Sequence, residues 1–421
     1  MIKQHTFDSG LRLIVETRKT TKIISTGIMV NVGAMNECEN EYGLAHLVEH
    51  TMFKSTKNYN FKDISKKLEG LGIKYNASTS KQCTYYYMDC IKDSLNQTYE
   101  IFADMFYNGI YDVDEIENEK RVVLEEMNMC EDSSYDILLY NIMNNMYNGS
   151  IVGHRVIGDR AVIENATPEI LKAFKEKYYT PDNMVVTVVG NITLEEAKDL
   201  VQKHFNSKYE KESTFKARLS DKIEPKITKK YQSIQKDEKQ INIAILIKAP
   251  RLNDKKYDAL NVYAKILGGG RCCRLFDRLR EREGLCYMVD ATAYSNILVG
   301  SLMVFVSTSK DNVPSALKAI KEEILNMCDT VTDEELNRAK VSLKTDLIFA
   351  SEITHIMAHS NANELYDFGK VLTIEKEAKD IDKVTLEKVN NIAHTIAKET
   401  KYTVCAVGDE LDEKVLKENY K

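Results

Sequence analysis

The sequence predicts an α+β protein built from two similar domains in tandem, each a mainly antiparallel sheet covered by helices in an α/β sandwich. Three observations lead to this prediction. The chain has 421 residues, a length that suits two domains of ordinary size. Strand-like and helix-like segments alternate within both halves. Finally, the halves share a sequence pattern on either side of a polar stretch that lacks apolar periodicity.

The internal repeat is clearest in a helical segment and the strand that follows it. DEIENEKRVVLEE at 114–126 aligns without gaps on DEELNRAKVSLKT at 333–345. The segment begins 76 residues before Gly190 in the first half and 75 residues before Gly408 in the second half. Because residue types and spacing both recur, we expect a duplicated structural unit.

Each half also contains an apolar, alternating segment that predicts a β-strand. These segments are IISTGIMVNVGA at 23–34 and INIAILIKAP at 241–250. The polar stretch between the halves then marks the boundary of the two domains. We expect an N-terminal domain at 1–208, a linker at 209–225 and a C-terminal domain at 226–421.

The composition excludes several classes of protein. Hydrophobic residues make up 43% and charged residues 29% of the chain, the balance of a soluble globular protein. No apolar run approaches the roughly 18 residues that span a bilayer, so we expect no membrane association. The net charge is −6 and the basic residues are scattered, which argues against nucleic-acid binding. The nine cysteines form no CxxC pair, and with no targeting segment at the N-terminus they predict reduced thiols and a cytoplasmic location.

One helical segment carries a pattern typical of a zinc site. In LAHLVEHTMFKST at 44–56, a periodicity of about 100° per residue places His46, Glu49 and His50 on the face opposite the apolar residues. Histidines at positions i and i+4 can bind one zinc ion with bonds of about 2.0–2.1 Å. The intervening Glu49 can act as general base on a zinc-activated water and return the proton to the leaving amine.

A catalytic zinc site normally has three protein ligands, so a further ligand is needed. In NEKRVVLEEMNM, Glu119 and Glu126 lie seven residues apart and share one helix face, whereas Glu125 points about 100° away. We assign Glu126 as the third ligand. Glu119 is a carboxylate that assists catalysis by orienting a ligand or the water, or else a surface carboxylate of its helix.

The second half lacks the corresponding donors. The repeat alignment places Arg338 opposite Glu119 and Thr345 opposite Glu126, and no histidine lies near Gly269, the position matching His50. We therefore expect one Zn²⁺ per chain, bound by the first half.

The sequence resembles the pitrilysin-type zinc peptidases with the inverted H-x-x-E-H motif, and most of all the bacterial insulinase-family proteins similar to the mitochondrial processing peptidase. The resemblance implies the fold shared by LuxS and the processing peptidase, and it covers most of the chain. It rests on GLAHLVEHTMFKST (43–56), YNASTSKQCTYYY (75–87), EKRVVLEEMNMCED (119–132), YYTPDNMVVTVVGNI (178–192) and GGGRCCRLFDRLREREGLCY (268–287).

The resemblance also implies roles for residues that the spacing alone does not single out. In such enzymes the strand with the N-A-x-T segment pairs with extended substrate, which makes Asn76 and Ala77 substrate-binding residues; a simple strand edge is the alternative. An arginine and a tyrosine of the second half reach the substrate, and here they are Arg280 and Tyr287. Chains of this length have two domains where longer members have four, so the resemblance implies a homodimer with these two residues completing the active site in trans.

The expected function is that of a zinc metalloendopeptidase that hydrolyses unfolded or extended peptides inside a closed chamber. A non-catalytic structural or regulatory homologue is the alternative, and the intact H-x-x-E-H motif argues against it. A metal-dependent hydrolase with a non-peptide substrate is a further alternative, because fold and metal do not fix the substrate.

Overall fold

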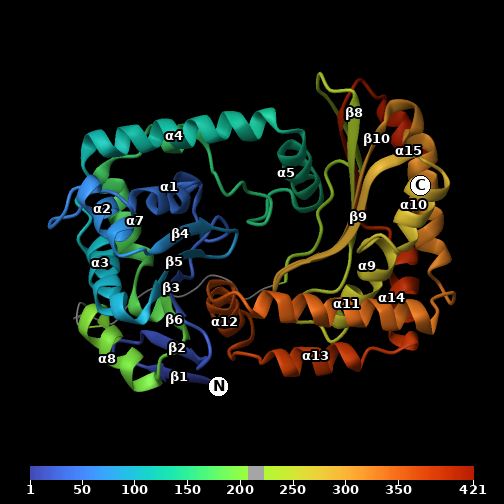
Figure 1. Cartoon of the computed structure of the whole chain (residues 1–421). Helices are drawn as coiled ribbons and strands as arrows, with labels where there is room; N and C mark the ends of the chain where they lie inside the picture. Colours follow the sequence, from blue (N-terminus) through green and yellow to red (C-terminus); the bar gives the residue numbers. More distant parts are fainter. Residues whose placement is uncertain (207–221) are drawn as a thin grey trace. The chain divides into compact units, whose positions relative to one another are not determined.

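A computed structural model describes residues 1–206 and 222–421 of the chain (Figure 1). These residues form two compact units, and each unit contains one sheet. Among the described residues, unit 1 comprises 1–128, 154–206 and 349–372, and unit 2 comprises 129–153, 222–348 and 373–421. Most of the predicted linker, 209–221, lies outside the described residues.

The sheet of unit 1 has six strands in the spatial order β1-β2-β6-β3-β5-β4. Neighbouring strands are antiparallel except for β2 and β6, which are parallel. Strand β6 is rich in valine, and all seven of its residues are buried, as expected for a central strand covered on both faces. The strands are β1 (Ile2–Thr6), β2 (Arg12–Thr17), β3 (Ile23–Val30), β4 (Lys74–Thr79), β5 (Thr84–Ile91) and β6 (Met184–Gly190).

The sheet of unit 2 repeats this topology. Its five strands have the order β7-β11-β8-β10-β9, and only β7 and β11 are parallel. Apart from β1, the strands of unit 1 follow the same order, with the parallel pair in the same place. The predicted mainly antiparallel, duplicated architecture is confirmed. The strands are β7 (Tyr231–Gln235), β8 (Gln240–Lys248), β9 (Cys286–Ser295), β10 (Gly300–Ser309) and β11 (Tyr402–Gly408).

One face of each sheet carries the main apolar core and the helices that close it. In unit 1, α1, α3 and α8 contact the sheet, and in unit 2, α9 and α10 do so. The helices of unit 1 are α1 (Leu44–Thr51), α2 (Phe61–Gly70), α3 (Leu95–Tyr107), most of α4 (Val113–Asp132), α6 (Arg160–Glu164), α7 (Pro168–Tyr178) and α8 (Leu194–His204). Those of unit 2 are α9 (Tyr257–Gly268), a π-helical segment (Phe276–Arg282), α10 (Val313–Asn326), most of α11 (Asp333–Ser351), α13 (Ile374–Asp382), α14 (Leu386–Lys398) and α15 (Glu413–Asn419).

The opposite face of each sheet is covered by a helix from the other half of the sequence. Helix α12 (Thr354–Phe368) packs on β3 and β6 in unit 1, and α5 (Ser134–Tyr147) packs on β8 and β11 in unit 2 (Figure 1). Polar contacts fix α12: Ser25 Oγ donates to Thr354 Oγ1 at 2.6 Å, and Asn361 Nδ2 donates to Glu16 Oε2 at 3.0 Å.

The tandem domains expected from the sequence include no such exchange of helices between the halves. The boundaries 1–208 and 226–421 follow the sequence repeat, whereas the compact units interleave the two halves. Within the described ranges no helix is both long and apolar enough to cross a membrane. No disulfide joins any of the nine cysteines, all of which lie within the described residues.

Candidate active site

Helix α1 carries the H-x-x-E-H motif, and the residues before it fix where the helix begins. Gly43 precedes the helix with a φ of 98°, and a Cβ there would lie 2.7 Å from the carbonyl oxygen of Ile157. The position therefore requires glycine. The carboxylate of Glu37 accepts hydrogen bonds from the backbone N–H groups of Gly43 at 2.9 Å and Ala45 at 2.7 Å, which satisfies two donors at the helix start. Burial raises the pKa of Glu37 to about 7, although these bonds favour its ionised form.

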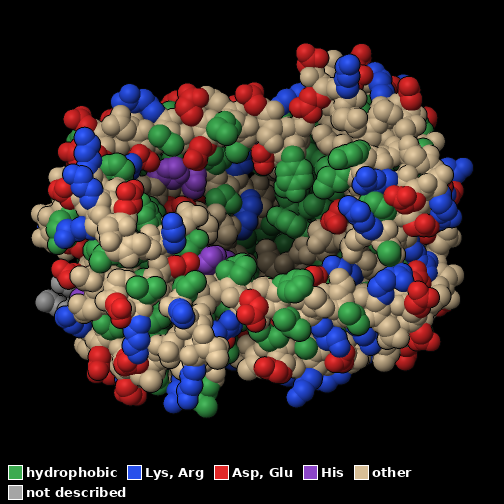
Figure 2. Space-filling view, in the orientation of Figure 1, with side chains coloured by type: hydrophobic (Ala, Val, Ile, Leu, Met, Phe, Trp, Pro, Cys, Tyr) green, Lys and Arg blue, Asp and Glu red, His purple; other side chains and the backbone are tan. Residues whose placement is uncertain are grey.

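The two faces of α1 divide as the sequence predicts. The apolar side is buried in the core of unit 1, and the polar side is partly exposed. Figure 2 shows histidine side chains reaching the surface where Figure 1 draws α1 and α4. The buried residues are Leu44, Ala45, Leu47 and Val48, and the partly exposed ones are His46, Glu49 and His50.

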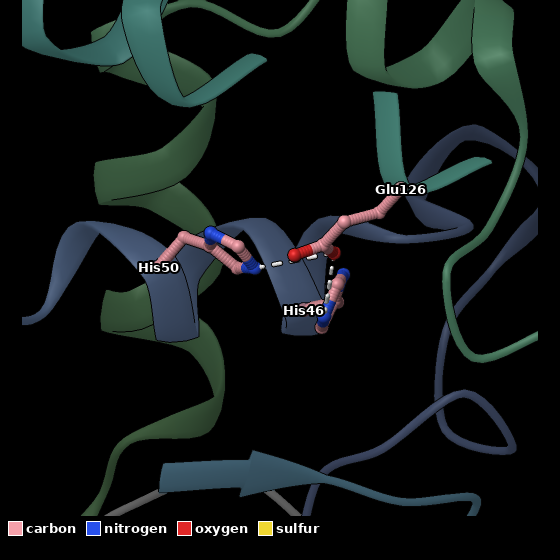
Figure 3. A group of neighbouring side chains, drawn as sticks. All are labelled: His46, His50 and Glu126. Carbon is pink, nitrogen blue, oxygen red and sulfur yellow. Dashed lines mark ion pairs between the residues drawn. The ribbon is translucent and has the colours of Figure 1, made fainter. Parts of the chain in front are cut away.

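The structure brings the three predicted metal ligands together (Figure 3). His46 Nε2 lies 3.8 Å and His50 Nε2 lies 3.6 Å from Glu126 Oε2, and one donor atom from each residue lies within 4.8 Å of the others. Ligand atoms bound tetrahedrally at about 2.0–2.1 Å are separated by about 3.3–3.4 Å, so a small closure of the side chains suffices to share one ion. Within 1–206 and 222–421, this is the only such group of at least three His, Cys, Asp or Glu residues.

The donor set suits zinc. Two imidazoles and one carboxylate form a three-ligand site that leaves a position for water. Burial, with a smaller effect from His50, lowers the pKa of His46 to about 4, so that imidazole is neutral at neutral pH and can offer a lone pair. The side chains of His46, His50 and Glu126 are 17%, 16% and 38% exposed, which leaves the group open to a metal ion and to substrate.

Glu49 is held by a residue that the sequence pattern did not single out. Thr79 Oγ1, at the end of β4, donates a 2.6 Å hydrogen bond to Glu49 Oε2. Burial raises the pKa of Glu49, and the hydrogen bond from Thr79 partly opposes that rise. Thr79 shares a strand face with Ala77, two residues earlier, which is the only signal in the sequence that could have connected it to the site.

Glu119 contacts one of the predicted metal ligands. It is buried, and its Oε2 lies 3.1 Å from His50 Nδ1, so it is not a surface carboxylate. Its other oxygen lies 2.5 Å from Lys54 Nζ, a second residue that the sequence pattern did not identify. Burial raises the pKa of Glu119, but the hydrogen bonds with His50 and Lys54 outweigh that effect and lower it.

Asn76 and Ala77 lie on β4, at the edge of the sheet of unit 1. This strand pairs with β5 on one side and contacts α1, the helix that carries the motif. Asn76 is exposed, and Ala77 is partly buried against the core. No strand in the described part of the chain pairs with the other side of β4, which leaves backbone groups there for an extended peptide.

Arg280 and Tyr287 lie together in unit 2. The Arg280 guanidinium carbon lies 5.2 Å from the centre of the Tyr287 ring and 4.9 Å from that of Phe276. Tyr287 is 76% exposed, which is unusual for a large aromatic residue. Arg280 belongs to the π-helical segment Phe276–Arg282, a type of local distortion that is frequent at functional sites.

The comparisons with known proteins identify the family. Residues 12–160 match the model of "Insulinase (Peptidase family M16)", and residues 165–343 match that of "Peptidase M16 inactive domain". The chain is 31% identical to an uncharacterized zinc protease of Mycobacterium leprae, over 98% of this chain and 92% of that protein. The chain belongs to the insulinase family. Another relative, an uncharacterized zinc protease of Bacillus subtilis, is 29% identical over 94% of this chain and 96% of its own length.

Solved structures agree with this insulinase-family fold. A protease from Helicobacter pylori superposes with a TM-score of 0.85 at 24% identity, covering 97% of this chain and 99% of that one. A protein from Pseudomonas fluorescens described as a peptidase M16 inactive domain superposes with a TM-score of 0.86 at 18% identity, covering 98% of both chains. The family resemblance and two-domain fold expected from the sequence are confirmed.

Proposed function

We propose that this insulinase-family protein is a zinc metalloendopeptidase that hydrolyses unfolded or extended peptides. The observation that carries the proposal is the convergence of His46, His50 and Glu126, with Glu49 on the same helix. The relatives from Mycobacterium leprae and Bacillus subtilis are named zinc proteases, which supports the choice of metal and reaction. We also propose a cytoplasmic location, a compartment in which the nine cysteines stay reduced.

The chemistry follows from the positions of the side chains. His46, His50 and Glu126 would hold one Zn²⁺ per chain, and the ion would supply Lewis acidity to the peptide carbonyl and the attacking water. Glu49 takes a proton from that water and passes it to the leaving amine. Thr79 keeps the Glu49 carboxylate oriented through its 2.6 Å hydrogen bond. Glu119 accepts a hydrogen bond from Nδ1–H of His50, which leaves Nε2 free to bind metal.

The substrate proposal rests on the edge strand β4. An extended peptide can add to a free strand edge through main-chain hydrogen bonds, whatever its side chains. We propose that Asn76 and Ala77 hold substrate in this way. Thr79 lies on the same strand and contacts Glu49, so a peptide added to β4 runs close to the general base.

We further propose a homodimer that encloses substrate in a chamber, in which Arg280 and Tyr287 of one subunit complete the active site of the other. The exposure of Tyr287 and its proximity to Arg280 support a role in binding. Mixing inactive Glu49→Gln and Arg280→Ala proteins should restore some activity, because one of the mixed sites then has both intact halves. No recovery after confirmed subunit exchange would contradict completion in trans.

The alternative is a non-catalytic structural or regulatory homologue. The match of residues 165–343 to a domain described as inactive concerns mostly the second half, where Arg338 and Thr345 stand in place of the two glutamates of the first half. The H-x-x-E-H motif at 46–50 lies outside this matched range.

Replacing Glu49 with glutamine distinguishes a zinc peptidase from a non-catalytic homologue. As the loss of a general base, it should lower turnover of a peptide mixture by about two to four orders of magnitude while zinc content stays unchanged. Glu125→Gln is the matched control, since Glu125 is exposed and adjacent to a ligand in sequence. Cut sites are read by mass spectrometry. Absence of cleavage by the zinc-loaded wild-type protein would favour the non-catalytic alternative.

A further inference from the structure

Lys54 lies close to the metal centre without belonging to it. It follows His50 by four residues, beyond the end of α1 at Thr51. Its ammonium group lies 2.5 Å from Glu119 Oε1, while Glu119 Oε2 lies 3.1 Å from His50 Nδ1. The Glu119 carboxylate therefore links the other two side chains, with one oxygen at the Lys54 ammonium group and the other at the His50 imidazole.

The environment makes this contact stronger than an ordinary surface ion pair. The side chains of Lys54 and Glu119 are only 24% and 11% exposed, so water competes weakly for either group. Lys54 Nζ also lies 4.8 Å from the centre of the Phe61 ring, which limits where the ammonium group can move. With Lys54 bound to Oε1, the carboxylate is held so that Oε2 faces the imidazole.

We propose that Lys54 is a positioning residue of the metal centre, acting on His50 through Glu119. The ammonium group fixes the rotation of the Glu119 carboxylate, the carboxylate fixes the ring plane and tautomer of His50, and Nε2 is thereby presented to the metal. His46 has no such support, because its buried Nδ1 has no hydrogen-bond partner in the described structure. Of the two histidines, only His50 is thus oriented by a carboxylate.

The inference rests on the proposed zinc site, so the test measures metal affinity separately from catalysis. Apo-protein is titrated with zinc against a chromophoric chelator for wild type, Lys54→Met, Lys54→Arg, Glu119→Gln and the Lys54→Met/Glu119→Gln double variant. Lys57→Met is the matched control, because Lys57 is exposed and follows closely in sequence. Circular dichroism checks that each variant is folded.

We expect Lys54→Met to weaken zinc binding by about tenfold, within the 10- to 100-fold range of changes to residues that orient a ligand. Lys54→Arg keeps the cation and should retain affinity close to wild type. In the Glu119→Gln background, Lys54→Met should have no further effect, because its action passes through the carboxylate. The cobalt(II) absorption bands of Lys54→Met should also differ from those of wild type and Lys57→Met.

The outcomes separate this inference from the proposed function. If wild-type protein binds no zinc, the proposed metal centre itself is wrong. If wild type binds zinc and Lys54→Met binds it equally well, the positioning role is wrong. If Lys54→Met weakens zinc binding equally in the wild-type and Glu119→Gln backgrounds, the positioning role is also wrong, because the effect then does not pass through the Glu119 carboxylate. Phe61→Leu keeps the ammonium group and should weaken zinc binding less than Lys54→Met does, and a loss equal to that of Lys54→Met would assign the effect to local packing.

Discussion

Replacing Thr79 with valine removes one hydroxyl group and leaves the shape of the side chain almost unchanged. That hydroxyl donates a 2.6 Å hydrogen bond to Glu49, the proposed general base. The bond is charge-assisted when Glu49 is ionised, as a base must be. Hydrogen bonds to charged groups contribute about 1.5–3 kcal/mol.

This energy sets the expected loss of activity. If the whole contribution is needed to orient Glu49 in the transition state, kcat/KM falls by about 10- to 150-fold, because each 1.36 kcal/mol corresponds to a factor of ten. Zinc content should not change, since Thr79 is not among the three grouped donors. Thr79→Ser keeps the hydroxyl and should retain most of the activity.

The assay compares kcat/KM of the three proteins on one fluorogenic peptide, with zinc measured in the same samples. Wild-type kcat/KM in Thr79→Val would refute the role of the hydrogen bond. Equal losses in the valine and serine variants would refute it as well, because the cause would then be the packing of β4 and not the hydroxyl.

Two further predictions concern the metal and the start of α1. Glu126→Gln should reduce zinc content while Glu125→Gln does not, and full zinc occupancy in Glu126→Gln by metal analysis would place the third ligand elsewhere. For Glu37, the pKa rises from 4.5 to about 7 on folding, so wild type loses stability as the pH rises through that range. Glu37→Gln cannot ionise and escapes the loss, which gives it a relative gain of up to about 3 kcal/mol between pH 4.5 and 8. Urea unfolding of both metal-free proteins measures the difference, and parallel pH curves would contradict it.

The local features of the site could be predicted from the sequence because they depend on helical periodicity. The spacing of His46, Glu49 and His50 fixes their common face, and the same argument selects Glu126 over Glu125. Both arguments describe what one helix presents on one side. Only the structure shows that α1 and α4 bring these side chains together, because helical periodicity does not determine how two helices pack.

Lys54 and Thr79 escaped prediction because their partners are distant in sequence. Lys54 meets a carboxylate 65 residues away, and Thr79 meets one 30 residues away. Neither residue type is rare in such segments, so only the folded chain distinguishes them from ordinary surface residues.

The covering of each sheet by a helix of the other half also could not be predicted. Helix α12 buries polar residues, among them Thr354 and Asn361, against a sheet face that offers Ser25 and Glu16 as partners. These buried polar side chains interrupt the apolar stripe by which core-facing helices are recognised. The pattern therefore reveals neither which face of α12 is buried nor which sheet it covers.

The exchange of helices has a consequence for synthesis on the ribosome. The last strand of the first sheet ends at Gly190, but the helix that covers its open face ends at Phe368. At about 5–20 residues per second, the ribosome needs roughly 9–36 s to make the intervening segment. During that interval the sheet face with Ser25 and Glu16 has no covering helix, because α12 has not yet been translated. The first half therefore completes its fold only after most of the second half has been synthesised.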